Sequence, residues 1–451
     1  MYALYSLLTA AGILLLSPYF LLRGLILGKY LDNIPERLGW RFPPELSDER
    51  SPDSTGKSIW IHAVSVGEVL AVLPLAQELK RRFPQRRIVV STTTVTGQKI
   101  ARERMSFADA VFFFPLDWIG PVQRALMAAR AAAVIIVETE IWPNFLRECR
   151  RAQVPVIFVN GRLSERSFRG YRRALLYSAG ALAGFLKKVL GEATLFLMQS
   201  EKDAARLIAL GAPSDRVLVT GNLKYDLAET SESPLSVWLE AEISKGNRRP
   251  LLIAGSVLAD EEVPVLQAFA EVEREFPYAL LILAPRKPEQ FDNAAAIVAD
   301  SGRRLLRRSE VSFNGTGPAA LSEQVNVFLL DSVGELAGLY RLADAVFVGG
   351  SLVPGGGHNI LEPAAFGKIP IYGPSMENFR EMSGKFLAAG AAMQVKSSEE
   401  LGAAWARLLR EPERADRMGT CARELVNRNR GATHQVLQHI ERVIGPDRIA
   451  K

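Results

Sequence analysis

The stretch "SIWIHAVSVGEVLAVLPLAQELKRRF", residues 58–83, sets a pattern that the rest of the chain repeats. Its first seven residues are an apolar run typical of a buried strand, and from Gly67 the apolar residues recur with helical spacing. Further short apolar runs alternate with helical segments as far as residue 221, and the alternation resumes at residue 251. This alternation predicts a parallel, doubly wound sheet in each half of the chain. We therefore expect an α/β protein with two Rossmann-like domains facing a cleft at the carboxyl ends of their strands.

The expected elements divide the chain into two halves. Strands are predicted in the first half at residues 58–64, 87–94, 111–115, 132–139, 154–160, 193–200 and 216–221, and in the second at 251–256, 278–285, 325–330, 344–350 and 369–373. A helix is expected within 171–189, a polar linker within 226–249, and a polar helical region at 398–443. The predicted domains are a membrane-anchor helix at 1–30, a first Rossmann-like domain at 31–230 and a second at 231–451, whose last helices can pack back on the first.

Composition excludes several classes of protein. The chain has 451 residues, 48% of them apolar and 23% charged, which fits an ordinary globular protein. Two cysteines cannot form a disulfide scaffold, and four histidines without metal-site spacing do not indicate zinc. No Asp-x-Asp pair occurs that could hold Mg²⁺ beside a nucleotide sugar. A net charge of +6 and a pI near 9.3 favour a basic surface facing phosphates or anionic lipid, and no nucleic-acid-binding motif accompanies the charge.

The N-terminus differs from the rest of the chain. Residues 1–22 carry no charged side chain, and as a helix they would span about 33 Å, close to the thickness of bilayer hydrocarbon. Arg23 and Lys29 follow the apolar run instead of preceding it, which is the wrong order for a cleaved signal peptide. By the positive-inside rule, this order predicts a membrane anchor with the following domains on the cytoplasmic side. The alternative is an amphipathic helix that lies in the membrane interface.

The tetrapeptide SVGE occurs twice, at Ser65–Glu68 and at Ser332–Glu335. Ser-x-x-Glu before an apolar run is the capping-box pattern, which contributes roughly 1 kcal/mol to helix stability and implies no function. Both copies, however, follow a predicted strand and open a predicted helix, at the end of the sheet where ligands bind. A role in helix capping and a role in the reaction therefore both remain possible for each of the two glutamates.

The segment "VFVGGSLVPGGGHNILEPAAFGKIPIYGP", residues 346–374, predicts a strand, a glycine-rich loop and a helix that starts near Asn359. The helix start offers unpaired N–H groups and the positive end of a dipole, which suit a phosphate. His358 and Asn359 would add side-chain donors, and Glu362 is placed to accept from ribose hydroxyls. A flexible surface loop is the alternative. The motif is not the GxGxxG of a first strand–helix turn, which argues against a dinucleotide dehydrogenase. The loop glycines are Gly349, Gly350, Gly355, Gly356 and Gly357.

Polar side chains also stand at the ends of other predicted strands. Carboxylates there need hydrogen-bond partners, and arginines there suit phosphate. The structural alternatives are a solvated arginine and a Trp142–Pro143 helix start. The candidates are Glu138 and Glu140 in "VETEIWPNF", Arg162 and Arg166 in "NGRLSERS", Lys224 in "GNLKYD", and Pro285 with Arg286 in "LAPRKPEQF".

Taken together, "HAVSVGE", "ETEIWPN", "RLSERS", "GNLKYD", "PRKPE", the glycine-rich segment and "ERLGW" at residues 36–40 resemble the motifs of the 3-deoxy-D-manno-octulosonic acid (Kdo) transferases of lipopolysaccharide synthesis. The resemblance implies a two-domain glycosyltransferase of the GT-B type on the cytoplasmic face of the inner membrane. It would move Kdo from CMP-Kdo to the 6′-hydroxyl of the tetraacylated lipid A precursor, lipid IVA, with inversion and without a metal or other cofactor. The first domain would hold the lipid acceptor, and the second would hold CMP-Kdo.

The resemblance also implies roles for residues. Glu68 would be the general base, and Glu138 the second acidic residue of the site. Two positions depart from the family pattern, because Leu258 and Lys287 stand where histidine is usual, which bears on details of the donor site. The implied CMP contacts are Pro285, Arg286, Val333, Gly334, Glu335, Asn359, Ile360, Leu361 and Glu362.

The residues themselves also predict a phosphate-binding loop, formed by Gly355, Gly356, Gly357 and His358. They also predict Arg162, Arg166 and Lys224 as contacts for the acceptor. Two alternatives remain open. One is another GT-B transferase that uses a UDP-sugar on a membrane lipid, and the other is a non-catalytic, membrane-tethered nucleotide-binding module.

Overall fold

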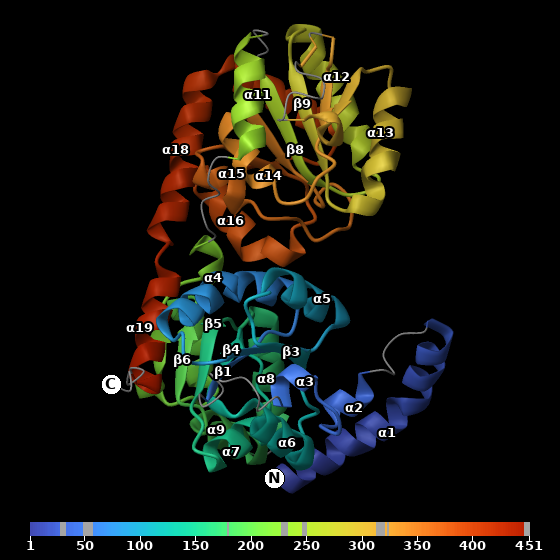
Figure 1. Ribbon diagram of the computed structural model, residues 1–451. Coiled ribbons are helices and arrows are strands. Elements are labelled where there is room, and N and C mark those ends of the chain that lie inside the picture. Colours follow the sequence, from blue (N-terminus) through green and yellow to red (C-terminus); the bar gives the residue numbers. More distant parts are fainter. Residues whose placement is uncertain are drawn as a thin grey trace. The chain divides into compact units, whose positions relative to one another are not determined.

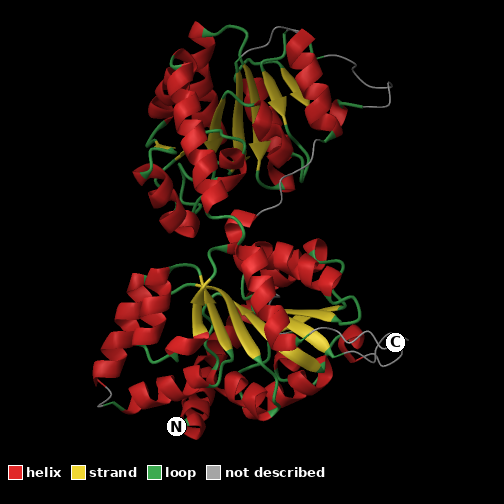
Figure 2. Cartoon of the chain, turned by 90° about the vertical axis from the view of Figure 1, so that its left-hand side faces the viewer, coloured by secondary structure: helices red, strands yellow, loops and turns green. Residues whose placement is uncertain are grey.

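The computed structural model describes residues 1–27, 33–47, 57–177, 180–226, 233–245, 250–312, 321–322 and 324–445. The chain forms two compact units (Figure 1). Unit 1 comprises Met1–Leu227 together with Asn429–Lys451, and unit 2 comprises Ala228–Arg428. Each unit is built around one parallel sheet with helices on both faces (Figure 2).

The sheet of unit 1 has the strand order β3-β2-β1-β4-β5-β6-β7, and all of its neighbouring strands run parallel. Its strands are buried on both faces, which explains why they read as continuous apolar runs. Trp60 packs on one face, and its neighbours Ile59 and Ile61 pack on the other. The strands are β1 (Ser58–His62), β2 (Ile88–Thr92), β3 (Ala110–Phe113), β4 (Ala131–Val137), β5 (Val156–Gly161), β6 (Leu195–Met198) and β7 (Val217–Val219).

Helices from distant parts of the chain cover the two faces of this sheet. One face packs against α6 (Ile119–Ala129), α7 (Pro143–Arg151) and α9 (Ala181–Gly191), and the other against α4 (Val66–Arg82), α5 (Val95–Arg104) and α19 (Ala432–Ile444). The last helix therefore belongs to unit 1. The carboxylate of Asp226 joins it to the end of the first chain segment by accepting from the N–H groups of Gly431, at 2.6 Å, and Thr433.

The sheet of unit 2 has the strand order β10-β11-β9-β8-β12-β13-β14 and is also entirely parallel. Its main core packs α12 (Glu262–Glu275), α13 (Phe291–Asp300) and α17 (Ser398–Arg410) against the sheet. The remaining helices are α11 (Pro234–Lys245), α14 (Leu336–Leu339), α15 (Leu361–Ala365), α16 (Arg380–Ala388) and α18 (Pro412–Arg428). The strands are β8 (Leu251–Val257), β9 (Leu280–Pro285), β10 (Leu305–Arg307), β11 (Val327–Leu329), β12 (Ala345–Val348), β13 (Pro370–Tyr372) and β14 (Met393–Gln394).

The structure corrects four expectations. The polar stretch 226–249, expected to be a linker and the start of the second half, contains the helix α11, which buries Leu235, Leu239 and Ile243. The helix expected within 171–189 is two helices, α8 (Glu165–Tyr177) and α9, and Gly180 caps α9 in the left-handed conformation. Strands β10 and β14 were not predicted from the sequence, because they have only three and two residues. The helix after the glycine-rich loop begins at Leu361 and has five residues.

The N-terminal helix α1 (Tyr2–Leu27) packs its first turns on unit 1. Asn144 Nδ2 donates to Ser6 Oγ at 2.9 Å, and Trp118 Nε1 donates to Thr9 Oγ1 at 3.2 Å. Several apolar side chains of the same turns are exposed, namely Leu4, Leu7, Leu8, Leu14 and Leu15. Side chains beyond Leu15 of α1 lie outside the described part. Within the described part of the chain, no helix is both long and apolar enough to cross a bilayer, so the expected anchor stays a prediction.

Candidate functional site

Each sheet has one point at which the strand order reverses direction. In unit 1 the chain passes from β1 to β2 and β3 on one side and then to β4 on the other. In unit 2 it passes from β8 to β9 on one side and later to β12 on the other. Ligands of open α/β sheets bind outside the carboxyl ends of the strands at such switch points. Glu68 and Glu138 follow β1 and β4, Arg286 follows β9, and the glycine-rich loop follows β12.

Glu68 lies in the first turn of α4, directly after β1, and is 7% exposed. Its Oε2 accepts from the N–H of Val64 at 2.8 Å, and its Oε1 accepts from the hydroxyl of Ser65 at 2.8 Å. The first SVGE therefore fixes the helix start, although Ser65 accepts no cap bond itself. Burial, and after it the charge of Glu138, raise the pKa of Glu68 to about 7. A carboxyl with this pKa can gain and lose a proton near neutral pH.

Glu138 follows β4 at the same switch point, with a φ of 62°. A left-handed conformation is unfavourable for a residue with a side chain, and such strain is concentrated at functional sites. Glu140 is close enough for the charge of Glu138, after burial, to raise its pKa. The ring of Tyr171 on α8 is near Glu140, since burial and the Glu140 charge together raise the pKa of its hydroxyl. Three carboxyl groups, those of Glu68, Glu138 and Glu140, therefore lie near one another after β1 and β4.

The second SVGE is arranged differently. Glu335 occupies the N-cap position of the four-residue helix α14 and makes no cap bond. Its carboxylate is held by the guanidinium of Arg308, with Nε–Oε2 at 2.9 Å and Nη2–Oε1 at 3.1 Å, and by the hydroxyl of Ser332 at 2.5 Å. Both side chains are partly exposed. Glu335 is therefore not a helix cap, and its carboxylate is engaged by Arg308, while Val333 and Gly334 beside it are exposed.

Four of the predicted donor-site residues, Arg286, His358, Asn359 and Glu362, come together at the carboxyl edge of unit 2. Burial lowers the pKa of His358, and the nearby charge of Arg286 lowers it further. Burial raises the pKa of Glu362, and the hydrogen bond from Asn359 and the charge of Arg286 offset part of that rise. Asn359 Nδ2 donates to Glu362 Oε1 at 3.1 Å, and Asn359 Oδ1 accepts from the N–H of Leu361 at 3.1 Å. The arrangement offers an exposed guanidinium beside a carboxyl oriented by an amide, which suits a phosphorylated sugar with free hydroxyl groups, such as the ribose phosphate of a nucleotide.

Backbone N–H groups of the glycine-rich loop donate hydrogen bonds to other groups of the protein. The N–H groups of Gly355 and Gly356 donate to Ser375 Oγ at 3.2 and 3.0 Å, and that of Gly357 donates to Gly350 O at 2.7 Å. The ring of His358 donates from Nδ1 to Gly349 O at 2.8 Å, so Nε2 of the neutral ring is an acceptor. The predicted phosphate loop thus has its amides already paired before any ligand arrives.

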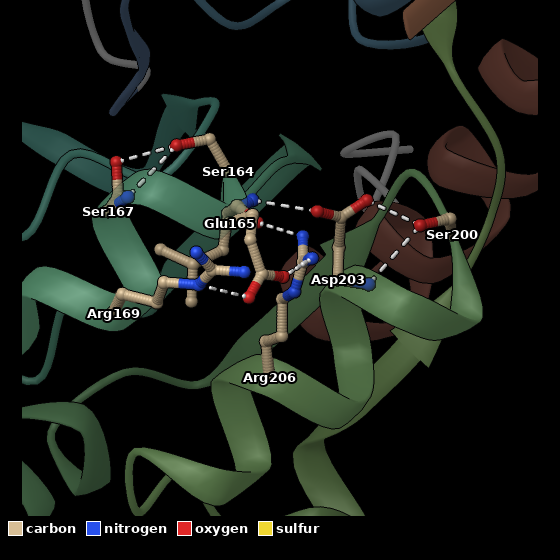
Figure 3. Close-up of polar contacts among 8 residues, drawn as sticks. Ser164, Glu165, Ser167, Arg169, Ser200, Asp203 and Arg206 are labelled. Atoms are coloured by element: carbon tan, nitrogen blue, oxygen red, sulfur yellow. Dashed lines mark hydrogen bonds and ion pairs between the residues drawn. The ribbon is translucent and has the colours of Figure 1, made fainter. Parts of the chain in front are cut away.

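The segment "RLSERS" forms an ordered polar network around the start of α8 (Figure 3). Glu165 lies between the guanidinium groups of Arg169, at 2.9 Å, and Arg206, and the hydroxyl of Ser164 caps the helix by accepting from the N–H of Ser167 at 3.1 Å. Asp203 of α10 (Glu201–Ala209) accepts from the N–H of Leu163 at 2.8 Å.

The predicted acceptor residues lie beside this network and the end of β5. The backbone of Arg162 exchanges hydrogen bonds with the hydroxyl of Thr139, at 2.7 and 2.9 Å, which joins it to the Glu138 edge. Arg166 is exposed on α8. Lys224 lies in a short turn that Asn160, at the end of β5, holds by accepting from the N–H of Leu223 at 3.0 Å. Their role toward an acceptor stays a prediction.

Sequence reasoning assigned no role to three charged residues that the structure brings to these edges. Glu261, after β8, is fully buried and binds the loop after β12. Arg308 pairs with Glu335. Arg37, in "ERLGW", lies over the ring of Phe113 at 4.7 Å and donates to Thr93 O, at the ends of β2 and β3. In the sequence, Glu261 lies four residues after the last residue of β8, in "GSVLADEE".

The two departures from the family pattern have distinct surroundings. Leu258 packs inside the glycine-rich loop, where a Cβ on Gly350 would come within 3.5 Å of its Cδ1. Lys287 is exposed beside Arg286. An apolar residue therefore fills the loop interior at position 258, and the extra cation at 287 faces outward.

The chain is similar to known proteins over most of its length. Residues 32–227 match the family model described as 3-deoxy-D-manno-octulosonic-acid transferase (kdotransferase), and residues 265–425 match glycosyl transferases group 1. The chain is 32% identical over 412 residues to the 3-deoxy-D-manno-octulosonic acid transferase of Haemophilus influenzae, covering 91% of each chain. It is 32% identical over 411 residues to that of Bordetella pertussis, covering 88% of this chain and 90% of the relative.

A solved structure extends the likeness to the fold. UDP-GlcNAc 2-epimerase from Neisseria meningitidis superposes with a TM-score of 0.52 at 14% identity, over 85% of this chain and all of that one. At this identity the match shows the fold alone, which is GT-B-like with two Rossmann-like sheets. With the match to the N-terminal family model and the two relatives, the chain belongs to the 3-deoxy-D-manno-octulosonic acid (Kdo) transferases and is a glycosyltransferase.

Proposed function

We propose that this Kdo transferase moves Kdo from CMP-Kdo to the 6′-hydroxyl of lipid IVA, with inversion at the anomeric carbon. The observation that carries the proposal is the buried Glu68 carboxyl at the β1–β4 switch point, whose pKa burial raises to about 7. Inverting transfer needs a base for the attacking hydroxyl, and Glu68 is in the right chemical state to serve near neutral pH.

In the proposed reaction, the acceptor oxygen forms a bond to the anomeric carbon as that carbon's bond to the CMP phosphate oxygen breaks. The hydroxyl proton passes to the Glu68 carboxylate, and CMP leaves with the bonding electron pair. A positioned base of this kind typically supplies roughly 10²–10⁴ in rate. Glu138, held in its left-handed conformation after β4, keeps negative charge near Glu68 and so favours proton uptake.

Unit 2 would hold the nucleotide. Arg286 supplies a charge-assisted hydrogen bond to the leaving phosphate, and Glu362, oriented by Asn359, accepts from ribose hydroxyls. Because the amides of Gly355–Gly357 are already paired, we assign further phosphate contacts to the N–H groups of residues 358–360. The contacts implied for Pro285, Val333, Gly334, Glu335, Ile360 and Leu361 stay predictions, as does the cleft expected between the domains.

We also propose that the enzyme works at the cytoplasmic face of the inner membrane. The exposed leucines of α1 and the basic net charge support this placement. Arg162, Arg166 and Lys224 would contact acceptor phosphates. Transfer without a metal is likewise a proposal, and unchanged product formation in the presence of EDTA would support it.

The test is product analysis by mass spectrometry, with the purified full-length enzyme, CMP-Kdo and lipid IVA. The proposal predicts a Kdo adduct of the lipid with equimolar CMP release, and protection of the enzyme against thermal unfolding by CMP but not by UDP. Protection by UDP alone would favour a transferase that uses a UDP-sugar. CMP binding without CMP release in the presence of acceptor would favour a non-catalytic module.

A further inference from the structure

A single buried carboxylate organises the switch point of unit 2. Glu261 accepts four backbone N–H bonds. Its Oε1 accepts from Ser351 and Leu352, both at 2.8 Å, and its Oε2 accepts from Gly350 at 2.6 Å and Leu258 at 2.9 Å. The side chain is 0% exposed. A buried charge is unfavourable unless it is fully hydrogen-bonded, so four donors on one carboxylate mark a built structure and not an accidental contact.

The contact joins two segments that are far apart in the sequence. Glu261 immediately precedes α12, after β8, whereas residues 350–352 begin the glycine-rich loop after β12. The packing is close enough to require glycine, because a Cβ on Gly349 would lie 2.6 Å from Ser256 O and 2.9 Å from Glu261 Oε2. Three successive amides turned toward one anion form a concave site of the kind that elsewhere binds a ligand anion. Here the protein supplies the anion itself.

The far limb of the loop is held separately. Ser375 Oγ accepts from Gly355 and Gly356, and Ser351 Oγ accepts from the N–H of Gly373 at 2.9 Å. With Glu261 on the near limb and Ser375 on the far limb, both limbs of the loop are fixed before it reaches His358. The backbone at the loop exit, where Asn359 and Glu362 stand, therefore has little freedom.

We infer that Glu261 is a positioning residue for nucleotide binding, acting through residues 350–352 to hold the loop exit at His358–Glu362 in its binding geometry. The inference rests on the proposed function for the ligand, CMP. It also explains how a negative charge can stand beside a phosphate-binding loop, since four N–H dipoles neutralise it.

Glu262 provides a matched control. It is the next residue, is also 0% exposed, and neither of its carboxylate oxygens has a hydrogen-bond partner in the described part of the chain. Glu261→Gln replaces one acceptor oxygen by an NH₂ group that faces backbone donors, whereas Glu262→Gln removes a neighbouring charge without touching the loop bonds.

The experiment measures amide hydrogen exchange in peptides covering residues 349–353, and the Kd for CMP, in the full-length protein and both variants. In Glu261→Gln we expect faster exchange in these peptides and a Kd for CMP raised about tenfold or more, since hydrogen bonds to charged groups are the strong ones. Glu262→Gln should leave both values near those of the unaltered protein. Transfer by Glu261→Gln at saturating CMP-Kdo should recover to within about fivefold, because the residue touches no reacting atom.

The outcomes separate the two claims. Unchanged exchange at residues 349–353 in Glu261→Gln, or equal changes in both variants, would overturn the positioning role. Faster exchange with an unchanged Kd for CMP would also overturn it. If the unaltered protein fails to bind CMP, the proposed function fails, and the exchange data still decide whether Glu261 fixes the loop. If Glu261→Gln does not fold, Ser375→Ala releases the other limb and should raise the Kd for CMP in the same direction.

Discussion

At the carboxyl ends of β1 and β4, Glu68 receives two hydrogen bonds and stands near Glu138, and its pKa rises to about 7. At the corresponding point of the other sheet, between β8 and β12, Glu261 receives four backbone N–H bonds. Both carboxyls are buried after the first strand of their unit. Burial and a neighbouring carboxyl raise the pKa of Glu68, whereas the four N–H donors of Glu261 tie it to the loop after β12.

The two copies of SVGE differ for a similar reason. Glu68 is buried and bonds only neutral donors within its own turn, whereas Glu335 pairs with the guanidinium of Arg308. The ion pair occupies the carboxylate of Glu335, while burial beside other carboxyls raises the pKa of Glu68. Identical tetrapeptides thus acquire different chemistry from residues far away in the sequence.

The largest expected effect is that of Glu68→Gln, which removes the proposed base. We expect kcat to fall by roughly 10²–10⁴, with the Kd for CMP unchanged, measured by single-turnover transfer and by CMP titration. Glu400→Gln is the matched control, because Glu400 Oε2 accepts from the N–H of Lys396 at 2.8 Å in the first turn of α17, much as Glu68 does in α4. If the two variants lost equal activity, Glu68 would be reduced to a structural cap.

The next effect in size concerns the nucleotide. Arg286→Ala should raise the Kd for CMP about tenfold or more, because a charge-assisted hydrogen bond to phosphate is lost. Isothermal titration with CMP measures the change. Arg274→Ala, which breaks a surface pair with Glu271, removes the same charge elsewhere and should leave the Kd unaltered. Equal affinity in the two variants would remove Arg286 from the nucleotide site.

A smaller effect is expected for Glu335→Gln. The pair with Arg308 is partly exposed and contributes at most about 1 kcal/mol, so kcat/KM for CMP-Kdo should change by less than about fivefold. Initial-rate measurements at varied CMP-Kdo test this expectation. A loss as large as that of Glu68→Gln would mean that the second SVGE carries chemistry after all.

The smallest effect is a shift along the pH axis. The charge of Glu138 raises the pKa of Glu68, so Glu138→Gln should lower that pKa and move the acid limb of the pH–rate profile to lower pH. Glu140→Gln should shift it less, since Glu140 is the weaker of the two influences. A shift to higher pH in Glu138→Gln would contradict the proposed electrostatic coupling.

The sequence predicted the architecture well, because buried parallel strands leave long apolar runs such as that of β4. It also placed Glu68 and Glu138 after the right strands, since the ends of parallel strands can be found from the pattern alone. The partner of Glu335 could not be predicted, because Arg308 is contributed by a different strand–helix unit. The contacts of Glu261 with the loop could not be predicted for the same reason, because three of its four partners lie some ninety residues away in the chain.

The most direct test of the proton-accepting role of Glu68 is the pH dependence of single-turnover transfer by the full-length enzyme at saturating CMP-Kdo and lipid IVA. Below its pKa the Glu68 carboxyl is protonated and cannot accept the hydroxyl proton, so the rate should rise with pH and level off above an inflection at about 7. The same inflection should be absent from the residual activity of Glu68→Gln. A rate that is flat through neutral pH, or an inflection that persists in Glu68→Gln, would contradict the assignment.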